Sequence, residues 1–355
     1  MTTTGKLSEN VLAQTAAIGD AVSRLEAAVL KLLVVLDGDD RVIGTVSDGD
    51  VRRGLLRGLS LASPVLEVIN ASPVLLGPGG DRPAVLAEMD ARMVKILPLV
   101  DSRGTLVGLE ELDPRPSGRD HPNLVVVMAG GKGTRLAPLT ETCPKPMVKI
   151  GEKPILETIV DQLRAQGFRR ICLSVNYLAE AVRDYFGDGA RWGVEISYIH
   201  ETEPRGTAGA LSLIREEPDA PVLVVNGDLL TRLDFSRLIS FHEEQRAEAT
   251  VCLREYEFQI PFGAVELDGV DIVRIREKPV YRCFVSAGIY CLSPQVLREV
   301  PLEGRHDMPE LLNCLAEQGR PIRPFPIHEY WLDIGCVQDL NLAQSDFRRL
   351  FIDPQ

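Results

Sequence analysis

A glycine-rich segment, Gly130-Gly131-Lys132-Gly133-Thr134-Arg135-Leu136, directly follows the apolar run 124–128. Glycines let the backbone approach a phosphate chain closely, and the free N–H groups of such a loop bind anions. Positive charge is close by in the sequence, at Arg135 and at Lys145 within Pro-Lys-Pro. An ordinary glycine turn does not account for these cations, so the segment predicts a loop that binds a phosphate chain.

Two other phosphate-binding motifs do not fit this segment. The dinucleotide-binding fingerprint needs a third glycine where this chain has Leu136. The P-loop needs Ser or Thr directly after its lysine, and Lys132 is followed by Gly133. The loop therefore belongs to neither of these two classes.

The segment resembles the signature of the sugar-nucleotide pyrophosphorylases, the sugar-1-phosphate nucleotidyltransferases. Their pattern of Gly-Gly-x-Gly-Thr-Arg-Leu, Pro-Leu-Thr and Pro-Lys-Pro occupies 130–136, 138–140 and 144–146, and the resemblance extends over about 124–342. It implies attack of a sugar-1-phosphate oxygen on the α-phosphorus of a nucleoside triphosphate, with release of pyrophosphate. It also implies nucleotide contacts by Ala129, Gly130, Gly131, Gly133, Thr134, Gly206 and Thr207.

The same resemblance gives roles to four charged residues. Arg135 would bind the leaving β,γ-phosphates, and Lys145 would neutralise charge on the α-phosphate. In-line phosphoryl chemistry depends on such positive charge more than on a proton shuttle. Asp228 and Asp333 match the family's two metal aspartates. Carboxylate oxygens are ligands that Mg²⁺ prefers, so Mg²⁺ is the expected cofactor.

A second set of motifs resembles the part of the family that binds the sugar. Gly263 stands where the family glycine lies against the hexose, and Glu277-Lys278-Pro resembles Glu-Lys-Pro, whose lysine meets the sugar phosphate. Ala287 and Gly288 belong to Ser-Ala-Gly-Ile-Tyr, where the family commonly has Asn-Ala-Gly-Ile-Tyr. Because of this departure at Ser286, the motif does not identify the sugar.

Glu201 occupies the position whose side chain reads the base in the family. Uridylyl and thymidylyl relatives often have glutamine there, which both donates and accepts hydrogen bonds, whereas an ionised carboxylate only accepts them. Guanine offers two adjacent N–H donors, while uracil and thymine offer one donor between two carbonyls. The residue favours GTP, with Glu203 as a competing reader and a uridylyl or thymidylyl enzyme as the alternative.

The elements expected to position these residues alternate between strand and helix. Such alternation predicts a Rossmann-like α/β domain with a largely parallel sheet, whose ligands bind at the carboxyl ends of the strands. The expected strands are 124–128, 170–175, 196–199, 222–225 and 250–254, and the expected helices are 155–165, 179–186, 208–214 and 235–246.

The chain before this domain contains two similar halves. Each has a strand, a turn and a strand: 32–36 and 41–46 in the first, with a helix expected over 50–59, and 96–100 and 106–109 in the second. The stretch 44–52 resembles the end of a CBS motif, and tandem CBS motifs form a compact α+β pair.

In the CBS family the positions of Ser47 and Asp50 can bind the ribose of an adenine nucleotide. The second half has an acidic residue where the first has Ser47. A pair used for packing or homo-oligomerisation is therefore an equal alternative to nucleotide sensing.

Prolines and a glycine between 113 and 122 predict a linker, giving domains 1–113 and 123–355 joined by 114–122. The chain has 355 residues and a formal charge of −12, which argues against general nucleic-acid binding. Seven scattered cysteines favour reduced thiols in a cytoplasmic protein, and no apolar run reaches membrane-spanning length.

The order of the two parts resembles bacterial guanylyltransferases that activate glucosamine 1-phosphate for nonulosonic (legionaminic) acid. Mannose- and heptose-1-phosphate guanylyltransferases share the motifs, so the sequence does not identify the sugar. The competing hypothesis is a catalytically inactive, nucleotide-sensing protein, but such a protein has no physical need for Arg135, Lys145, Asp228, Lys278 and Asp333 together.

Overall fold

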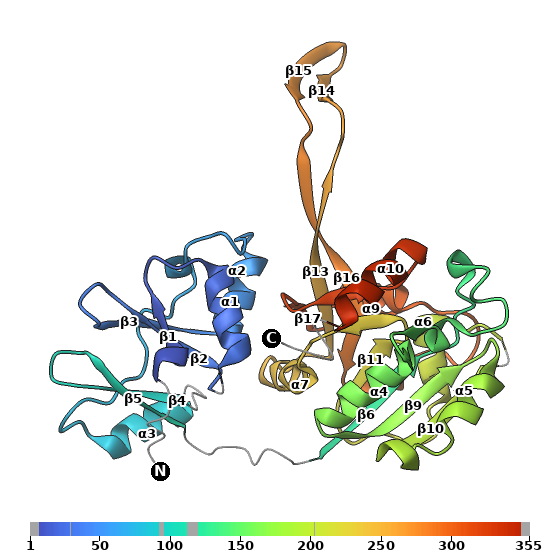
Figure 1. Cartoon of the computed structure of the whole chain (residues 1–355), viewed down its shortest axis with the longest axis horizontal. Coiled ribbons are helices and arrows are strands. Elements are labelled where there is room, and N and C mark those ends of the chain that lie inside the picture. The colour runs from blue at the N-terminus through green and yellow to red at the C-terminus, as the bar shows by residue number, and fades with distance from the viewer. Residues whose placement is uncertain (1–6, 29, 92–95, 112–119, 202, 349–355) are drawn as a thin grey trace. The chain divides into compact units, whose positions relative to one another are not determined.

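The computed structural model divides into two compact units, residues 1–117 and 118–355. It describes residues 7–28, 30–91, 96–111, 120–201 and 203–348 (Figure 1). Most of the linker expected at 114–122 lies outside these ranges. Its last two residues, His121 and Pro122, belong instead to a strand, where a proline is tolerated because it stands at the strand's start.

Two β-hairpins form the framework of the first unit. Its elements are η1 (Leu7–Asn10), β1 (Val11–Ala13), α1 (Ile18–Ala27), β2 (Leu32–Leu36), β3 (Val42–Ser47), α2 (Asp48–Leu56), η2 (Val65–Glu67), α3 (Arg82–Ala91), β4 (Ile96–Val100) and β5 (Leu106–Glu111). Strand β1 joins the β2–β3 hairpin in a three-stranded sheet, and β4 and β5 form the second hairpin. Val34 and Leu36 of β2 pack with Leu109 of β5, so the two halves share a small core.

The two hairpins of this unit have the same turn. In the first, Asp37 Oδ1 accepts hydrogen bonds from the amides of Asp39 and Arg41, each at 2.9 Å. In the second, Asp101 Oδ1 accepts them from Arg103 and Thr105 at 2.8 and 2.9 Å. These bonds stabilise the ionised form and lower the pKa of both aspartates. The two halves therefore repeat in detailed geometry as well as in element order.

A seven-stranded sheet forms the centre of the second unit, in the order β10-β9-β6-β11-β16-β13-β17. Its strands are β6 (His121–Met128), β9 (Phe168–Val175), β10 (Glu195–His200), β11 (Val222–Asn226), β13 (Ala249–Gln259), β16 (Val280–Leu292) and β17 (Ile322–Pro326). Neighbours pair in parallel except where β16 meets β11 and β13. The predicted, largely parallel sheet is therefore confirmed.

Helices cover both faces of this sheet. Val125 and Val127 of β6 face a core built with α4 (Ile155–Ala165), α5 (Ala179–Phe186), α7 (Phe235–Glu244) and α10 (Val337–Phe347). Leu124 and Val126 face a second core with α6 (Gly206–Gly209), η6 (Ala210–Leu213), α8 (Pro294–Leu297) and α9 (Met308–Glu317). Burial of alternate residues on opposite faces explains why the run 124–128 is continuously apolar.

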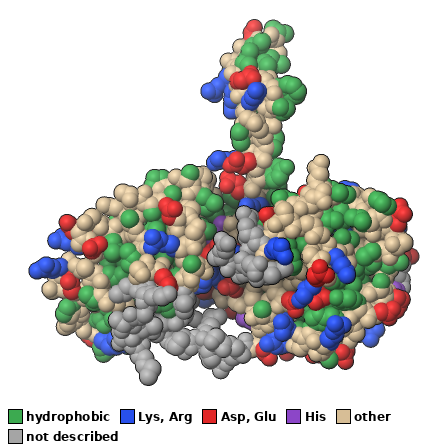
Figure 2. Space-filling model, viewed as in Figure 1, with side chains coloured by type: hydrophobic (Ala, Val, Ile, Leu, Met, Phe, Trp, Pro, Cys, Tyr) green, Lys and Arg blue, Asp and Glu red, His purple; other side chains and the backbone are tan. Residues whose placement is uncertain are grey.

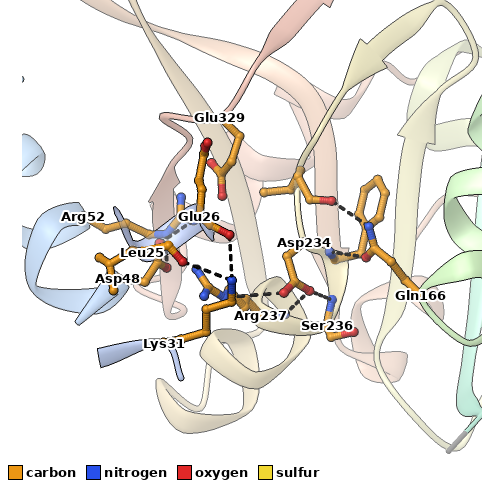
Figure 3. A network of polar contacts seen from close by, with 12 residues as sticks. Leu25, Glu26, Lys31, Asp48, Arg52, Gln166, Asp234, Ser236, Arg237 and Glu329 are labelled. Carbon is orange, nitrogen blue, oxygen red and sulfur yellow. Dashed lines mark hydrogen bonds and ion pairs between the residues drawn. The ribbon is translucent and has the colours of Figure 1, made fainter. Parts of the chain in front are cut away.

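Polar contacts at the start of α7 show why this helix begins at Phe235. Asp234 Oδ1 accepts hydrogen bonds from the amides of Ser236 and Arg237 at 3.0 and 3.3 Å (Figure 3). Gln166 accepts a bond from the Phe235 amide and donates one to Leu233 O. These bonds satisfy N–H groups that have no partner inside a helix, and they join α7 to the end of α4.

Several boundaries differ from those expected. The helix expected at 50–59 is α2, which begins at Asp48 because Ser47 caps it and ends before Gly58, at φ 87°. The segment 208–214 forms α6 followed by the 3₁₀ turn η6. Strand β13 continues to Gln259, five residues beyond the predicted end. None of the described helices is long and apolar enough to cross a membrane.

Strands β13 and β16 continue beyond the sheet as an antiparallel arm. Strand β17 accompanies β13 only as far as Leu253, whereas the β13–β16 pairing continues to Gln259 opposite Val280. A further hairpin, β14 (Ala264–Asp268) with β15 (Asp271–Arg276), lies beyond it. Figure 1 shows this arm projecting from the body of its unit.

Candidate active site

Loops at the carboxyl ends of four neighbouring strands, β6, β9, β10 and β11, meet at a pocket of about 390 Å³. This is the edge where open parallel sheets bind ligands. The smaller elements nearby are η3 (Thr134–Leu136), η4 (Lys145–Met147), β12 (Leu229–Thr231) and β18 (Trp331–Asp333). The pocket is lined by Met128, Gly130, Gly131, Lys132, Asn176, Glu201, Pro204, Gly206, Thr207, Asn226, Asp228, Arg305 and Asp307.

The glycine loop and the Pro-Lys-Pro segment are packed against each other. Gly133 has a φ of 63°, and a Cβ added to it would lie 2.7 Å from the Lys145 Cβ. The Thr140 hydroxyl donates a hydrogen bond to Gly133 O at 2.8 Å. Glycine is therefore required at 133 by both backbone conformation and close contact. Three separate parts of the sequence motif form one local structure.

Lys145 and Asp228 form an ion pair beside the pocket. The lysine is buried, with 7% of the residue exposed, although it comes from η4 and the aspartate from the end of β11. A buried cation in this position needs a partner charge, which Asp228 supplies. The contact joins two residues that are 83 positions apart in the sequence.

Asp333 lies beside Asp228 because β12 and β18 pair directly. Leu229 stands opposite Asp333, and the Ile334 amide donates a hydrogen bond to Asp228 O at 3.0 Å. Although the Asp333 side chain reaches solvent, reduced hydration and then the Asp228 charge raise the pKa of its carboxyl. Lys145 and Arg135 oppose that shift, so all four predicted charged residues are close enough to interact.

These aspartates are chemically suited to a divalent cation. Two carboxylates whose charges repel one another are stabilised by a cation between them, and their oxygens are hard ligands. Lys145 bonds one oxygen of Asp228, Oδ2. The other oxygen of Asp228 and the carboxylate of Asp333 could hold the expected Mg²⁺. The donor set therefore fits the ion.

Glu201 is buried at the pocket wall, with 6% of the residue exposed. Its Oε1 accepts a hydrogen bond from the Ser174 hydroxyl at 2.7 Å, and its Oε2 accepts one from the Arg205 amide at 2.9 Å. Because each carboxylate oxygen has about two acceptor sites, each keeps one for a ligand. The competing residue Glu203 is exposed and does not line the pocket.

Gly206 and Thr207 line the pocket beside the loop that precedes α9. Gly206 has a φ of 78°, and a Cβ there would lie 2.5 Å from His306 O. Asp307 Oδ1 accepts a hydrogen bond from the Thr207 amide at 3.2 Å, and the Thr207 hydroxyl accepts one from the Met308 amide at 2.8 Å. Glycine is thus needed at 206 by close backbone contact.

The remaining loop residues expected to contact the nucleotide are not among those that line the pocket. Ala129 is buried and donates a hydrogen bond from its amide to Ser174 O at 2.8 Å. Thr134 begins η3 and is exposed. Of the expected nucleotide contacts in this loop, Gly130 and Gly131 are the ones that line the pocket.

The residues expected to bind the sugar fall into two groups. Gly288 adjoins the pocket residue Asn226, since a Cβ at Gly288 would lie 2.5 Å from Asn226 Nδ2, whereas Ala287 is buried in the core. Gly263, Glu277 and Lys278 lie on the projecting arm and are not among the pocket residues (Figure 1). The structure does not bring these three to the pocket, because β13 and β16 stay paired and extended as far as Gln259.

Seven pocket residues were given no role from the sequence: Met128, Lys132, Asn176, Pro204, Asn226, Arg305 and Asp307. Asn176 and Asn226 stand at the carboxyl ends of β9 and β11, so the strand-end rule could have identified them. Asn176 Nδ2 bonds Glu201 O at 2.6 Å. Arg305 and Asp307 come from a loop with no periodic pattern, and no local signal marks them.

Ser47 and Asp50 in the first unit form a helix capping box. The amide and hydroxyl of Ser47 donate to Asp50 Oδ2 at 2.8 and 2.6 Å, and the Asp50 amide donates to Ser47 Oγ at 3.3 Å. The pair therefore has a structural role in starting α2. Asp50 also lines a hollow of about 400 Å³ with Arg53 and Arg57.

The model of the nucleotidyl transferase family matches residues 124–349. This range covers the sheet and every residue of the pocket described above. The chain belongs to the nucleotidyl transferase family. It shares the family's α/β fold with a mostly parallel central sheet.

The relatives of this chain include proteins named for two different bases, guanine and uracil. Mannose-1-phosphate guanylyltransferase catalytic subunit beta of Danio rerio is 36% identical over 224 residues, covering 60% of this chain and 61% of the relative. UTP–glucose-1-phosphate uridylyltransferase of Synechocystis is 34% identical over 234 residues, covering 60% of each chain. This chain therefore spans about three fifths of the length of these relatives.

Solved structures share the fold of the second unit. HddC from Yersinia pseudotuberculosis, also solved in complex with GMP-PN, is 28% identical with a TM-score of 0.51 and covers 63% of this chain and 99% of its own. A putative glucose-1-phosphate thymidylyltransferase from Bacillus anthracis is 22% identical with a TM-score of 0.52, covering 64% and 96%. The second of these similarities concerns the fold alone.

Proposed function

We propose that this protein transfers a nucleotidyl group from a nucleoside triphosphate to a sugar 1-phosphate, giving an NDP-sugar and pyrophosphate. One observation carries this proposal: the glycine loop, the buried Lys145–Asp228 pair and Asp333 are assembled at one edge of the sheet. The names of the relatives, which act on mannose 1-phosphate and glucose 1-phosphate, support the substrate class.

The cations beside the loop would organise the phosphates. A sugar-phosphate oxygen attacks the α-phosphorus, and the bond from that phosphorus to the bridging oxygen of the leaving pyrophosphate breaks. Arg135 would bind the leaving pyrophosphate, and Lys145 would neutralise negative charge on the α-phosphate. The ion pair with Asp228 would keep the lysine in position. Fixed charges of this kind stabilise the transition state because they need no reorganisation during reaction.

Asp228 and Asp333 would hold Mg²⁺. A bound Mg²⁺ neutralises phosphate charge and helps orient the substrates. The chain's own contribution is to keep the two carboxylates adjacent through the β12–β18 pairing. Lys145 limits the orientations open to Asp228.

GTP is the favoured nucleotide. Glu201 lines the pocket, and each of its carboxylate oxygens keeps an acceptor site after its bond to Ser174 or Arg205, which would suit the adjacent N1–H and N2–H donors of guanine. The guanylyltransferase names among the relatives agree with this choice. A uridylyl or thymidylyl activity is the second candidate, favoured by the Synechocystis relative.

The first unit would act as a tandem CBS-like domain. Its repeated hairpins and matching aspartate turns support an internal pair, and the hollow beside Asp50 offers the arginines Arg53 and Arg57 to a phosphorylated ligand such as an adenine nucleotide. With a CBS pair preceding the transferase, GDP-glucosamine for nonulosonic acid or another surface glycan is the proposed product.

A substrate panel tests this function. The full chain is incubated with each of four nucleoside triphosphates and with glucosamine, mannose, glucose and heptose 1-phosphates, and pyrophosphate release is measured. The proposal predicts release that needs both substrates and is fastest with GTP. Fastest release with UTP or dTTP would reject the guanylyl assignment while leaving the transferase class intact. No release with any pair would support the inactive, nucleotide-sensing alternative.

A further inference from the structure

Exposed apolar side chains are concentrated on the arm. Among the described residues, 12 of the 21 exposed large hydrophobic side chains lie between residues 256 and 284. Figure 2 shows hydrophobic side chains along the projecting arm. Such clustering is unusual for a surface that stays in water, because isolated exposed apolar residues are normally scattered.

The tip hairpin has one apolar side and one charged side. Directly opposite residues of a hairpin share a side, and Val265 faces Ile275 while Leu267 faces Ile272. The other side carries Glu266 with Arg274 and Ala264 with Arg276. A hairpin with this alternation is built to have one side in water and one side covered.

The stem of the arm repeats the arrangement. Phe258 stacks on Tyr281 with ring centroids 5.5 Å apart, next to Tyr256 on the same side of the hairpin. On the other side Glu257 and Arg282 form an ion pair at 2.6 Å, and the exposed side chains of Val280 and Phe284 lie on that side as well, so the stem is less sharply divided than the tip. Tyr256 and Phe258 are 54% and 45% exposed, so stacking within the arm leaves much of the rings uncovered.

We propose that this apolar side is an interface with a second copy of the chain. The arm face is defined here by Tyr256, Phe258, Val265, Leu267, Ile272, Ile275 and Tyr281. Outside residues 256–284, the exposed large hydrophobic residues in the described parts of the chain are too dispersed to match it: Leu56, Leu61, Leu66, Val107, Leu139, Leu178, Leu302, Val337 and Leu342. The matching surface is therefore the arm face itself, which two copies bury symmetrically.

The exposed apolar area of the arm face and the low stability of an isolated hairpin both support a dimer through this face. Seven half-exposed apolar side chains offer roughly 700 Å² per chain, close to the ~800 Å² per partner of a standard interface. An isolated two-stranded hairpin is marginally stable in water and needs further packing. Contact between arms in a two-fold dimer supplies that packing, and the charged sides remain in water.

Sedimentation analysis of the full chain tests the proposal. The wild type, at about 1–50 µM, is expected to have a mass that is an even multiple of 39.0 kDa. Ile275→Asp and the double variant Val265→Asp/Ile275→Asp place carboxylates in the arm face and should halve that mass. Ala264→Asp is the matched control, because it adds the same group on the charged side opposite Arg276, and should keep the wild-type mass.

These positions are exposed or half-buried, so all variants should keep the wild-type circular dichroism spectrum and melting behaviour. The proposal is contradicted if the wild type sediments as a single chain throughout the range. It is equally contradicted if the double variant sediments with the wild-type mass. It is also contradicted if Ala264→Asp sediments with the same reduced mass as the double variant. None of these measurements depends on pyrophosphate release, so their outcome is independent of the proposed reaction.

Discussion

At the scale of single residues, the pocket depends on a few charges held in place by neighbouring groups. Lys145 is paired with Asp228, Asp333 stands beside that pair, and Glu201 is fixed by Ser174. The roles of Lys145, Asp228 and Asp333 were expected from motifs that lie far apart in the sequence. Their proximity required the fold, because no sequence spacing brings residue 333 beside residue 228.

Removing either of the two proposed metal ligands is the first residue-scale prediction. Asp228→Asn and Asp333→Asn should each lower turnover by ~10²–10³, because each removes charge from a cooperating electrostatic set. Asp219→Asn, at an exposed carboxylate outside the pocket, is the control and should leave turnover unchanged. Near-normal turnover of either pocket variant at saturating Mg²⁺ would exclude that residue from the metal site.

The base-reading role of Glu201 gives the second prediction. Glu201→Gln replaces one acceptor oxygen by a donor group, which should cost ~1.5–3 kcal/mol against GTP and improve UTP and dTTP in relative terms. The ratio of kcat/KM values for the three nucleotides measures this change. Glu203→Gln is the control, since that side chain is exposed and outside the pocket. A larger shift in Glu203→Gln than in Glu201→Gln would contradict the assignment.

At the scale of elements, the alternating pattern predicted the body of the sheet but not its extension. Strands 124–128 and 222–225 were expected because continuous apolar runs mark buried parallel strands. The tip hairpin has a local signal, since Asp268-Gly269 stands between alternating apolar and charged residues, but that pattern does not show that the hairpin projects from the sheet. The arm is also what places Lys278 away from the pocket.

A buried histidine that joins α7 to its neighbours gives an element-scale prediction for pH. His242 contacts Thr250 Oγ1 through Nδ1 at 2.9 Å and Ser293 Oγ through Nε2 at 3.0 Å. Burial lowers the pKa of His242 to about 4. The folded protein therefore favours the neutral ring, whereas the unfolded chain gains a proton near its usual pKa of about 6.5.

Stability should consequently fall as the pH is lowered from about 6.5 to about 4, and this contribution should then level off. The loss from this group is at most roughly 3 kcal/mol. Denaturant unfolding of the wild type and of His242→Asn across this pH range measures the loss. The free energy of unfolding of the variant should depend less steeply on pH than that of the wild type. Equal slopes in the two proteins would contradict the buried neutral histidine.

At the scale of the whole molecule, the two units have separate cores. The first is built around Ile18, Leu33 and Val46, and the second around the seven-stranded sheet. Every residue of the described pocket lies after residue 120. The sequence predicts a division near residues 113–122, because prolines mark breaks in regular structure. The sequence alone did not show whether the first unit binds a ligand, since Ser47 and Asp50 also serve as a cap.

Truncation is the prediction at this scale. A chain beginning at His121 should fold and keep its transferase activity, because both sheet cores and the pocket are retained. Any response of activity to added AMP or ATP should be lost on truncation. Arg57→Ala tests the hollow with a side chain that bonds Glu67 O and not the Ser47–Asp50 cap, and it should reduce that response in the full chain. A folded but inactive truncated chain would show that catalysis needs both units.

The central claim is that one pocket joins a nucleoside triphosphate to a sugar 1-phosphate through Lys145 and its neighbours. Its most direct test follows GTP labelled at the α-phosphate in the presence and absence of a sugar 1-phosphate. The account predicts that the label enters a GDP-sugar with one equivalent of pyrophosphate, only when both substrates are present, and that Lys145→Ala abolishes both signals. Release of orthophosphate, release of pyrophosphate without the sugar, or full activity in Lys145→Ala would contradict it.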